Sequence, residues 1–234
     1  MKLGIMQPYF LPYIGYWQLI NAVDKYVVYD DVNFIKGGWI NRNRILLNGE
    51  VKYINIPMLG ASSNKLINEI GVNHDSQIMK KTLKMFASAY EKAPYYKQGY
   101  ELFNEILNCE EEILSEYILN SMKVICRYLD IDTELILSSD INKDCTLKAQ
   151  DKVLHICQLL HATEYYNAVG GQTLYSFEKF RERDIALNFL KTDEICYNQF
   201  GGMTQSNLSI IDVIMFNSKD EISEMLNKYS LIVE

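Results

Sequence analysis

A strand, a helix and a second strand at the start of the chain constrain the fold most. Leu3 to Met6 is an all-apolar run that ends at Gln7-Pro8, as a buried parallel strand would. Apolar residues at helical spacing run from Tyr16 to Val23, and the β-branched and aromatic stretch from Lys25 to Asp30 reads as a strand. Strands joined through a helix lie parallel, so we expect an α/β fold with a Rossmann-like, mostly parallel sheet.

The ends of these two strands predict where a ligand binds. In parallel sheets, ligands bind beyond the carboxyl ends of the strands. Those ends are Gln7 and the pair Asp30-Asp31, which neighbouring strands bring together. A carboxylate there can act as a general base, a Mg²⁺ ligand or an acceptor for a sugar hydroxyl, so Asp30 and Asp31 are candidate catalytic residues. The alternative is an ion pair with Lys36, Arg42 or Arg44 that also holds the loop.

The next segment predicts a β-hairpin and then helices. Two apolar runs, Arg44 to Leu47 and Val51 to Ile56, flank Asn48-Gly49, which is a strong hairpin signal. Leu66 to Val72 is a further candidate strand. We expect the region 75–130 to be a helical insertion within a single α/β domain that spans 1–234.

Within this insertion the apolar spacing predicts two helices, Ser76 to Tyr90 and Tyr100 to Leu129. The acidic run Glu110 to Glu112 should form a solvated face of the second helix. Alternating strands and helices then resume. The expected strands are 133–138, 163–168 and 185–190, and the expected helices are 148–160, 176–183 and 218–228.

Charge and cysteine usage limit the functional classes. A net charge of -7 argues against a broad nucleic-acid surface, so any anion would bind in a local positive pocket. The 5 cysteines include no CxxC pair, which indicates reduced thiols. With neither a leader-like start nor an apolar run of transmembrane length, the sequence predicts a cytoplasmic protein without a membrane span.

A cationic cluster follows the second strand. Lys36, Arg42 and Arg44 lie beside Gly37-Gly38, where backbone amides can approach a ligand. Arginine binds phosphate or carboxylate in a bidentate manner and lysine adds a point charge, so these residues predict an anion pocket. Its neighbours Trp39, Asn41 and Asn43 are candidate substrate-binding residues. The alternative is a surface hairpin on which the two arginines share a face.

The remaining candidates are scattered along the chain. Gln7 and Tyr9 could contact a ligand, or Gln7 could satisfy only backbone groups at the turn. His74 is a candidate catalytic residue, with a helix-start role as the alternative. Ser139 and the pair Gly170-Gly171 follow strands and could line the same cleft. No histidine has the spacing of a metal ligand and no cofactor motif occurs, so we predict no metal site and leave the cofactor unknown.

The opening segment resembles the WbqC-like protein family. The resemblance rests on a Gln-Pro-aromatic turn, a helix ending in Ala-x-Asp, a strand ending in Asp-Asp-Val and a Trp-x-Asn-Arg-Asn segment. In this chain these are Gln7, Pro8, Tyr9, Pro12, Gly15, Tyr16, Ala22, Asp24, Asp30, Asp31, Val32, Trp39, Asn41, Arg42 and Asn43. Met6 stands where many family members have a histidine. The turn is also similar to that of HxGH-type nucleotidyltransferases, with Tyr16 at the place of their second histidine.

The resemblance implies work on a nucleotide-linked sugar in bacterial surface-polysaccharide biosynthesis, such as O-antigen assembly. The expected reaction is transfer of an acyl or aminoacyl group to an amino sugar, which makes a nucleotide-linked sugar and an acyl or aminoacyl donor the expected partners. Two alternatives stay open: a non-catalytic protein that binds a nucleotide sugar or a glycosyltransferase, and a nucleotidyltransferase or hydrolase. A homodimer is also left open.

Overall fold

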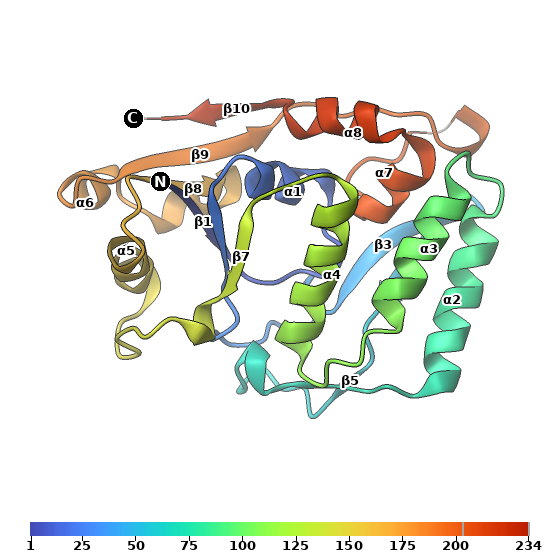
Figure 1. Cartoon of the computed structure of the whole chain (residues 1–234), viewed down its shortest axis with the longest axis horizontal. Helices are drawn as coiled ribbons and strands as arrows, with labels where there is room; N and C mark the ends of the chain where they lie inside the picture. Colours follow the sequence, from blue (N-terminus) through green and yellow to red (C-terminus); the bar gives the residue numbers. More distant parts are fainter. Residues whose placement is uncertain (203, 234) are drawn as a thin grey trace.

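A parallel sheet forms the centre of the computed structural model, which describes residues 1–202 and 204–233. Its strands are β1 (Lys2–Met6), β2 (Lys25–Val28), β7 (Glu134–Leu137), β8 (Glu164–Ala168), β9 (Ala186–Thr192) and β10 (Tyr229–Ile232). Within the described residues they pair in the order β10-β9-β8-β1-β2-β7 (Figure 1). Every neighbouring pair is parallel except β9 and β10. The predicted α/β fold is therefore confirmed.

The chain path through this sheet is doubly wound. From β1 the chain moves outward to β2 and β7, and then returns to the other side of β1 to form β8 and β9. The predicted parallel pairing of the first two strands is confirmed, with Met6 opposite Val28. The direction of winding reverses between β1 and β8, which is where doubly wound sheets open a crevice at their carboxyl edge.

Helices cover both faces of the sheet. On one face lie α1 (Ile14–Asn21) and α8 (Lys219–Leu226), and on the other lie α5 (Ala149–Leu159) and α6 (Phe177–Arg181) (Figure 1). Side chains alternate along the strands, so Leu3 and Ile5 join the apolar cluster of α5 and α6. Tyr26 and Val28 instead join the cluster of α1.

The long connection between β2 and β7 carries the hairpin and a group of helices. The predicted hairpin is present as β3 (Arg42–Leu47) and β4 (Glu50–Asn55). Asn48 and Gly49 turn the chain with φ of 52° and 79°, the backbone conformation that two-residue hairpin loops require. A shorter pair follows, β5 (Met58–Leu59) with β6 (Gly71–Val72).

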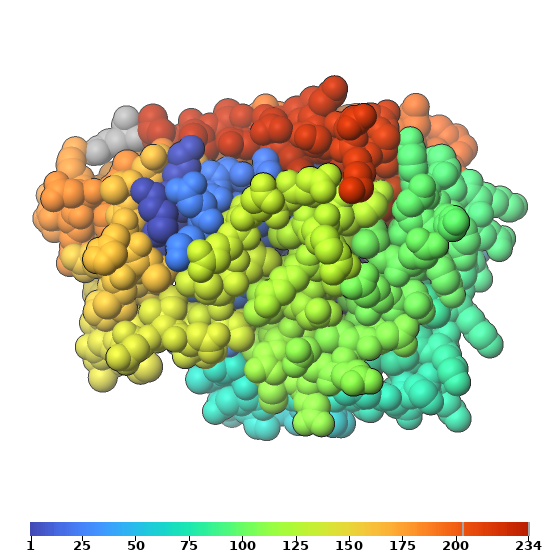
Figure 2. All heavy atoms as spheres, in the orientation of Figure 1, coloured from blue at the N-terminus to red at the C-terminus, as the bar shows by residue number. Residues whose placement is uncertain are grey.

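The helices of this connection are α2 (Ser76–Tyr90), α3 (Tyr96–Leu107) and α4 (Leu114–Tyr128). Helix α3 packs against α2, α4 and also α7 (Ile210–Phe216). They account for most of the green surface in Figure 2. Phe103 of α3 and Tyr117 of α4 belong to the same apolar cluster as Trp17 of α1, so these helices extend the core of the domain. None of the helices described has the length and apolar character needed to cross a membrane.

The prediction of one helix from Tyr100 to Leu129 is wrong. Residues 108–113 leave the helical path because they pair with the segment around β6: the carbonyl of Glu112 accepts from the Val72 amide (2.8 Å) and the Leu114 amide donates to Ile70 (2.8 Å). The acidic run Glu110 to Glu112 therefore lies in a connection rather than on a helix face. Backbone pairing overrides the helical pattern here.

The prediction of a strand from Leu66 to Val72 is also largely wrong. Ile67–Glu69 forms a 3₁₀ turn, Leu66 forms an isolated bridge with Asn33, and the strand itself is Gly71–Val72. The turn is closed by the Glu69 carboxylate, which accepts from the Leu66 amide at 2.8 Å. The edge strand β10 was not predicted from the sequence.

Gly15 provides a test of how tightly α1 packs against the sheet. A Cβ at this position would lie 2.4 Å from Thr192 Oγ1 and 2.5 Å from the Tyr13 ring. We expect Gly15→Ala to lower the free energy of unfolding by about 1–3 kcal/mol in urea denaturation, because the clash outweighs the better helix propensity of alanine. Gly170→Ala is the control, since its Cβ would meet nothing within 4 Å. Equal stability of the two variants would contradict this packing.

Candidate functional site

The carboxyl edge of the sheet gathers several of the predicted site residues. Gln7 follows β1, Asp30 and Asp31 follow β2, Ser139 follows β7, and the pair Gly170-Gly171 follows β8. Because these strands are parallel, their carboxyl ends lie along one edge. The Gln7 carbonyl accepts a hydrogen bond from the Tyr16 hydroxyl (2.8 Å). Its half-buried side-chain amide makes no hydrogen bond within the described part of the chain.

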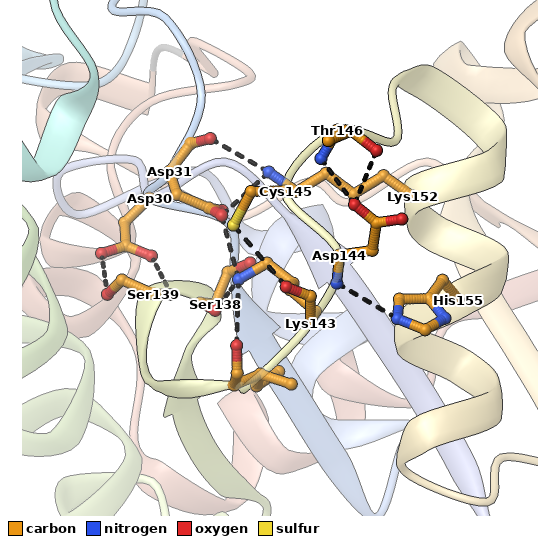
Figure 3. Close-up of polar contacts among 11 residues, drawn as sticks. Asp30, Asp31, Ser138, Ser139, Lys143, Asp144, Cys145, Thr146, Lys152 and His155 are labelled. Atoms are coloured by element: carbon orange, nitrogen blue, oxygen red, sulfur yellow. Dashed lines mark hydrogen bonds and ion pairs between the residues drawn. The ribbon is translucent and has the colours of Figure 1, made fainter.

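Asp30 joins two of these strand ends. Its fully buried carboxylate accepts from the Ser139 amide (2.9 Å) and from the Ser139 hydroxyl (2.7 Å) (Figure 3). Two predicted site residues are thus brought together by direct contact. The contact uses both carboxylate oxygens, and it fixes the turn after β7 to the end of β2.

Asp31 binds two lysines that the sequence did not point to. One of its oxygens, Oδ2, lies 2.9 Å from Lys143 Nζ and 2.8 Å from Lys152 Nζ (Figure 3). Lys143 also donates to the carbonyls of Ser138 and Ile141. Both lysine side chains are buried, at 2% and 9% exposure. We call Asp31, Lys143 and Lys152 the ion cluster.

Electrostatics keep the Asp31 carboxyl ionised. Burial raises its pKa, but Lys152, the adjacent Ser138 hydroxyl and Lys143 together outweigh burial, and the pKa lies below its usual range. Oδ1 has no partner with hydrogen-bonding geometry among the described residues. A carboxylate with a lowered pKa is a weak base. The lowered pKa and the two lysine contacts therefore favour a positioning role for Asp31.

A cavity of about 260 Å³ lies at the start of α1, beside the turn that follows β1. We call it the aromatic pocket. Its lining residues are Tyr9, Pro12, Tyr13, Trp39, Asn43, Arg44 and Asn207. Four of them, Tyr9, Trp39, Asn43 and Arg44, are sequence-predicted substrate-binding residues. Burial raises the pKa of both Tyr9 and Tyr13, so their hydroxyls are neutral hydrogen-bonding groups.

Arg44 supplies the charge of this pocket. Its Nη2 donates to the Asn207 carbonyl (2.8 Å), and its guanidinium carbon lies 5.2 Å from the centre of the Trp39 ring. Nε is buried and has no hydrogen-bond partner in the described residues. A buried donor without a partner is costly, so the fold holds this guanidinium in place at the expense of one hydrogen bond.

Asn43 connects two of the segments that form the aromatic pocket. Its side-chain amide donates to the Phe10 carbonyl (3.1 Å), and its side-chain oxygen accepts from the Arg44 amide (2.8 Å). Asn43 is buried, so these bonds fix the start of β3 to the turn after β1. Its contribution to the site is therefore to position Arg44.

A second cavity, of about 220 Å³, contains the other two predicted cations. We call it the cationic pocket, and its lining residues are Phe34, Lys36, Gly37, Asn41, Arg42, Asn55, Met58, Ala61 and Ser62. Arg42 donates to the carbonyls of Gly37 and Gly38. The three predicted cations thus do not form one pocket: Lys36 and Arg42 line this cavity, whereas Arg44 lines the aromatic pocket.

His74 and the two glycines lie outside both pockets. His74 precedes α2, and its Nε2 lies 2.9 Å from the Glu111 carbonyl oxygen. Gly170 is exposed, and a Cβ there would meet nothing within 4 Å. Gly171 is buried, and a Cβ there would lie 2.7 Å from Asn167 Oδ1, so it permits close packing after β8.

A buried carboxylate that the sequence did not point to supports one wall of the aromatic pocket. Asp212 accepts hydrogen bonds from Tyr90 (2.6 Å), Tyr197 (2.7 Å) and Gln199 (2.6 Å). Burial raises its pKa despite these three donors. Gln199 in turn bonds both backbone groups of Gln205, so the network anchors the segment that leads into Asn207.

One of the missed residues left a signal in the sequence. Lys152 lies four residues before Ile156 on α5, on the apolar face of that helix, and the pattern alone would direct it toward the sheet. Lys143 and Asn207 lie in connections without periodicity. For these two residues, the sequence carries no comparable signal.

Comparisons with known proteins give a family but no activity. The model of the WbqC-like protein family matches residues 7–224. The chain is also similar to the uncharacterized protein Rv1507c of Mycobacterium tuberculosis (strain ATCC 25618 / H37Rv), with 27% identity over 229 residues that cover 96% of this chain and 97% of the relative. No solved structure matches the chain.

The ion cluster predicts a pH-dependent loss of stability on mutation. Asp31→Asn should lower the free energy of unfolding at pH 7 by about 3 kcal/mol, because it leaves two buried lysines without their carboxylate. A lowered native pKa stabilises the fold above the unfolded pKa, and this contribution disappears as the pH falls through the native value. The difference between wild type and variant should therefore shrink below about pH 4 in urea titrations.

Asp140→Asn is the matched control. Asp140 lies in the turn that follows β7, close to the ion cluster in the chain, and unlike the contacts of Asp31 its side chain is exposed. We expect it to change stability by less than about 0.5 kcal/mol. If Asp31→Asn unfolded at pH 7 at the same urea concentration as the wild type, the ion cluster would contribute nothing to the stability of the fold.

Proposed function

The chain belongs to the WbqC-like protein family, and from this membership and the aromatic pocket we propose a transferase that acts on a nucleotide-activated amino sugar. The transferred group is an acyl or aminoacyl group, and the amine of the sugar accepts it. The setting is the assembly of bacterial surface polysaccharide. This is the activity that the resemblance implies and that the site geometry supports best.

The aromatic pocket is the observation that carries the proposal. Tyr9, Tyr13 and Trp39 offer ring faces against which the C–H face of a sugar can pack. Arg44 and Asn207 add polar groups that can bond hydroxyls or a carbonyl. Apolar walls with few polar groups are typical of small-molecule sites, and at about 260 Å³ the cavity is just below their usual size range.

Arg44 is the residue to which we assign the chemistry. The sugar amine attacks the carbonyl of an activated acyl ester or thioester, a C–N bond forms, and the bond from the carbonyl to the leaving group breaks. The amine proton passes to the leaving group, so the balance requires no protein base. The Arg44 guanidinium, which lines the pocket, can stabilise the oxyanion that develops on the carbonyl.

The predicted catalytic carboxylates have a different place in this proposal. Asp30 accepts hydrogen bonds from Ser139, and Asp31 pairs with the two lysines of the ion cluster. Neither carboxylate lines the aromatic pocket. His74 also lies elsewhere. We therefore assign Asp30, Asp31 and Ser139 to the positioning of the strand ends.

The test is product formation by the purified protein. Incubation with UDP- or dTDP-linked amino sugars and acyl donors, including acyl thioesters and aminoacylated tRNA, should yield an N-acylated nucleotide sugar by mass spectrometry. Arg44→Lys should lower kcat by roughly tenfold to a hundredfold, because it removes the planar fork of donors while keeping the charge. Trp39→Ala should raise KM by about tenfold through lost stacking.

Arg127→Lys is the control for arginine replacement, since this exposed residue of α4 pairs with Glu105 of α3 and lines neither pocket. Its kinetics should match the wild type. Binding of the amino-sugar nucleotides without turnover would instead identify a non-catalytic binding protein. Release of pyrophosphate or free nucleotide would identify nucleotidyl transfer or hydrolysis, and either result would overturn the proposal.

A further inference from the structure

The cationic pocket is electrostatically unlike the rest of this acidic chain. Two cationic side chains, Lys36 and Arg42, line it, and its lining includes no carboxylate. Lys36 is exposed and forms no ion pair or hydrogen bond within the described residues. In a chain of net charge -7, a cavity with two cations and no acid is a local site for an anion.

The pocket is also preorganised around Arg42. Nε donates to Gly38 O (3.1 Å) and Nη2 donates to Gly37 O, so the guanidinium is fixed while Nη1 makes no hydrogen bond within the described part of the chain. The guanidinium carbon lies 4.6 Å from the centre of the Tyr53 ring. Gly37 has a φ of 77°, a conformation that a residue with a side chain adopts only under strain.

Polar neighbours complete the lining. Asn41 is held by its bond to the Ile56 carbonyl (3.3 Å), and Asn55 extends from the exposed side of β4. The Ser62 hydroxyl oxygen accepts from the Asn64 amide (3.2 Å), which leaves its proton available for donation. Hydrogen-bond donors beside two cations suit phosphate oxygens.

A row of side chains links this cavity to the aromatic pocket. Arg42 and Arg44 alternate along β3 and so share a face, and Tyr53 pairs with Arg44 across the hairpin. The Tyr53 and Trp39 rings lie 6.4 Å apart, between the two guanidinium groups. Trp39 and Tyr53 are 38% and 42% exposed, so one ligand can pass over them.

We propose that the cationic pocket binds the diphosphate of the nucleotide-linked sugar whose sugar ring occupies the aromatic pocket. Trp39 lies between the two subsites and contacts the ligand where sugar and diphosphate join. The orientation of the ligand rests on the proposed function, whereas the diphosphate subsite rests on Lys36 and Arg42 alone. Arg44 is then left for the acyl carbonyl rather than for the phosphates.

The test measures binding of inorganic pyrophosphate and of UDP to the full chain by calorimetry at two ionic strengths. Lys36→Ala should weaken both ligands by about tenfold, the loss expected for one ammonium–phosphate contact, and the wild-type affinity should fall as salt rises. Lys36→Arg should restore most of the affinity.

Lys52→Ala is the matched control. Lys52 lies on the same hairpin but pairs with Ile45 on the opposite face, where it binds Glu50. Its removal should leave both affinities unchanged. Equal weakening by Lys52→Ala would indicate non-specific attraction and would overturn the proposal, as would an unchanged affinity in Lys36→Ala or a wild type that binds no pyrophosphate.

The outcomes separate this inference from the proposed function. If Lys36→Ala loses pyrophosphate binding while the wild type forms no acylated sugar, the diphosphate subsite stands and the transferase proposal fails. If the wild type forms the product while pyrophosphate binding is independent of Lys36, the transferase proposal stands and the diphosphate subsite fails.

Discussion

The hydrogen bonds of the buried segment Phe10 to Pro12 hold together the parts of the chain that form the aromatic pocket. The Phe10 amide donates to the carbonyl of Ile40 (3.0 Å), which ties the turn after β1 to the hairpin. The Leu11 carbonyl accepts from the Ser209 hydroxyl (2.7 Å), and the Pro12 carbonyl accepts from the Ile210 amide (2.9 Å). A buried backbone group without a partner costs about 1–3 kcal/mol, so each of these bonds constrains the fold.

The same bonds explain how pockets built mainly from loops can be rigid. Leu11 has a φ of 44°, which a residue with a branched side chain adopts only when its surroundings impose it. The start of α7 imposes it from one side, and Asn43 fixes the neighbouring Phe10 carbonyl from the other. Tyr9 and Trp39 are therefore displayed by backbone that is bonded on both sides. Such a site requires little ordering when a ligand binds.

Sequence reasoning succeeded where the determining interactions are local. The strand–helix–strand unit and the Asn48-Gly49 hairpin are encoded within a few residues, and both predictions are confirmed. The predictions failed where a segment distant in the sequence determines the local structure or the partner of a side chain. The break before α4 depends on backbone pairing with Val72, and the partners of Asp31 lie 112 and 121 residues further along the chain (143 − 31 and 152 − 31). A single sequence does not reveal which strand ends become neighbours, so Lys143 and Lys152 could not be assigned to Asp31.

The cations of this protein fall into two groups with different consequences. The buried Lys143 and Lys152 both pair with the Asp31 carboxylate, so their charges stabilise the fold. Arg42 and Arg44 are fixed by backbone carbonyls and aromatic rings, and among the described residues neither they nor Lys36 pair with any of the many acidic side chains. A carbonyl or a ring sets the position of a guanidinium without neutralising it. Because an exposed ion pair contributes only about 0–1 kcal/mol, leaving these cations without carboxylates costs the fold little. Their charge thus remains available for an anionic ligand, and the hairpin is where this acidic chain can bind one.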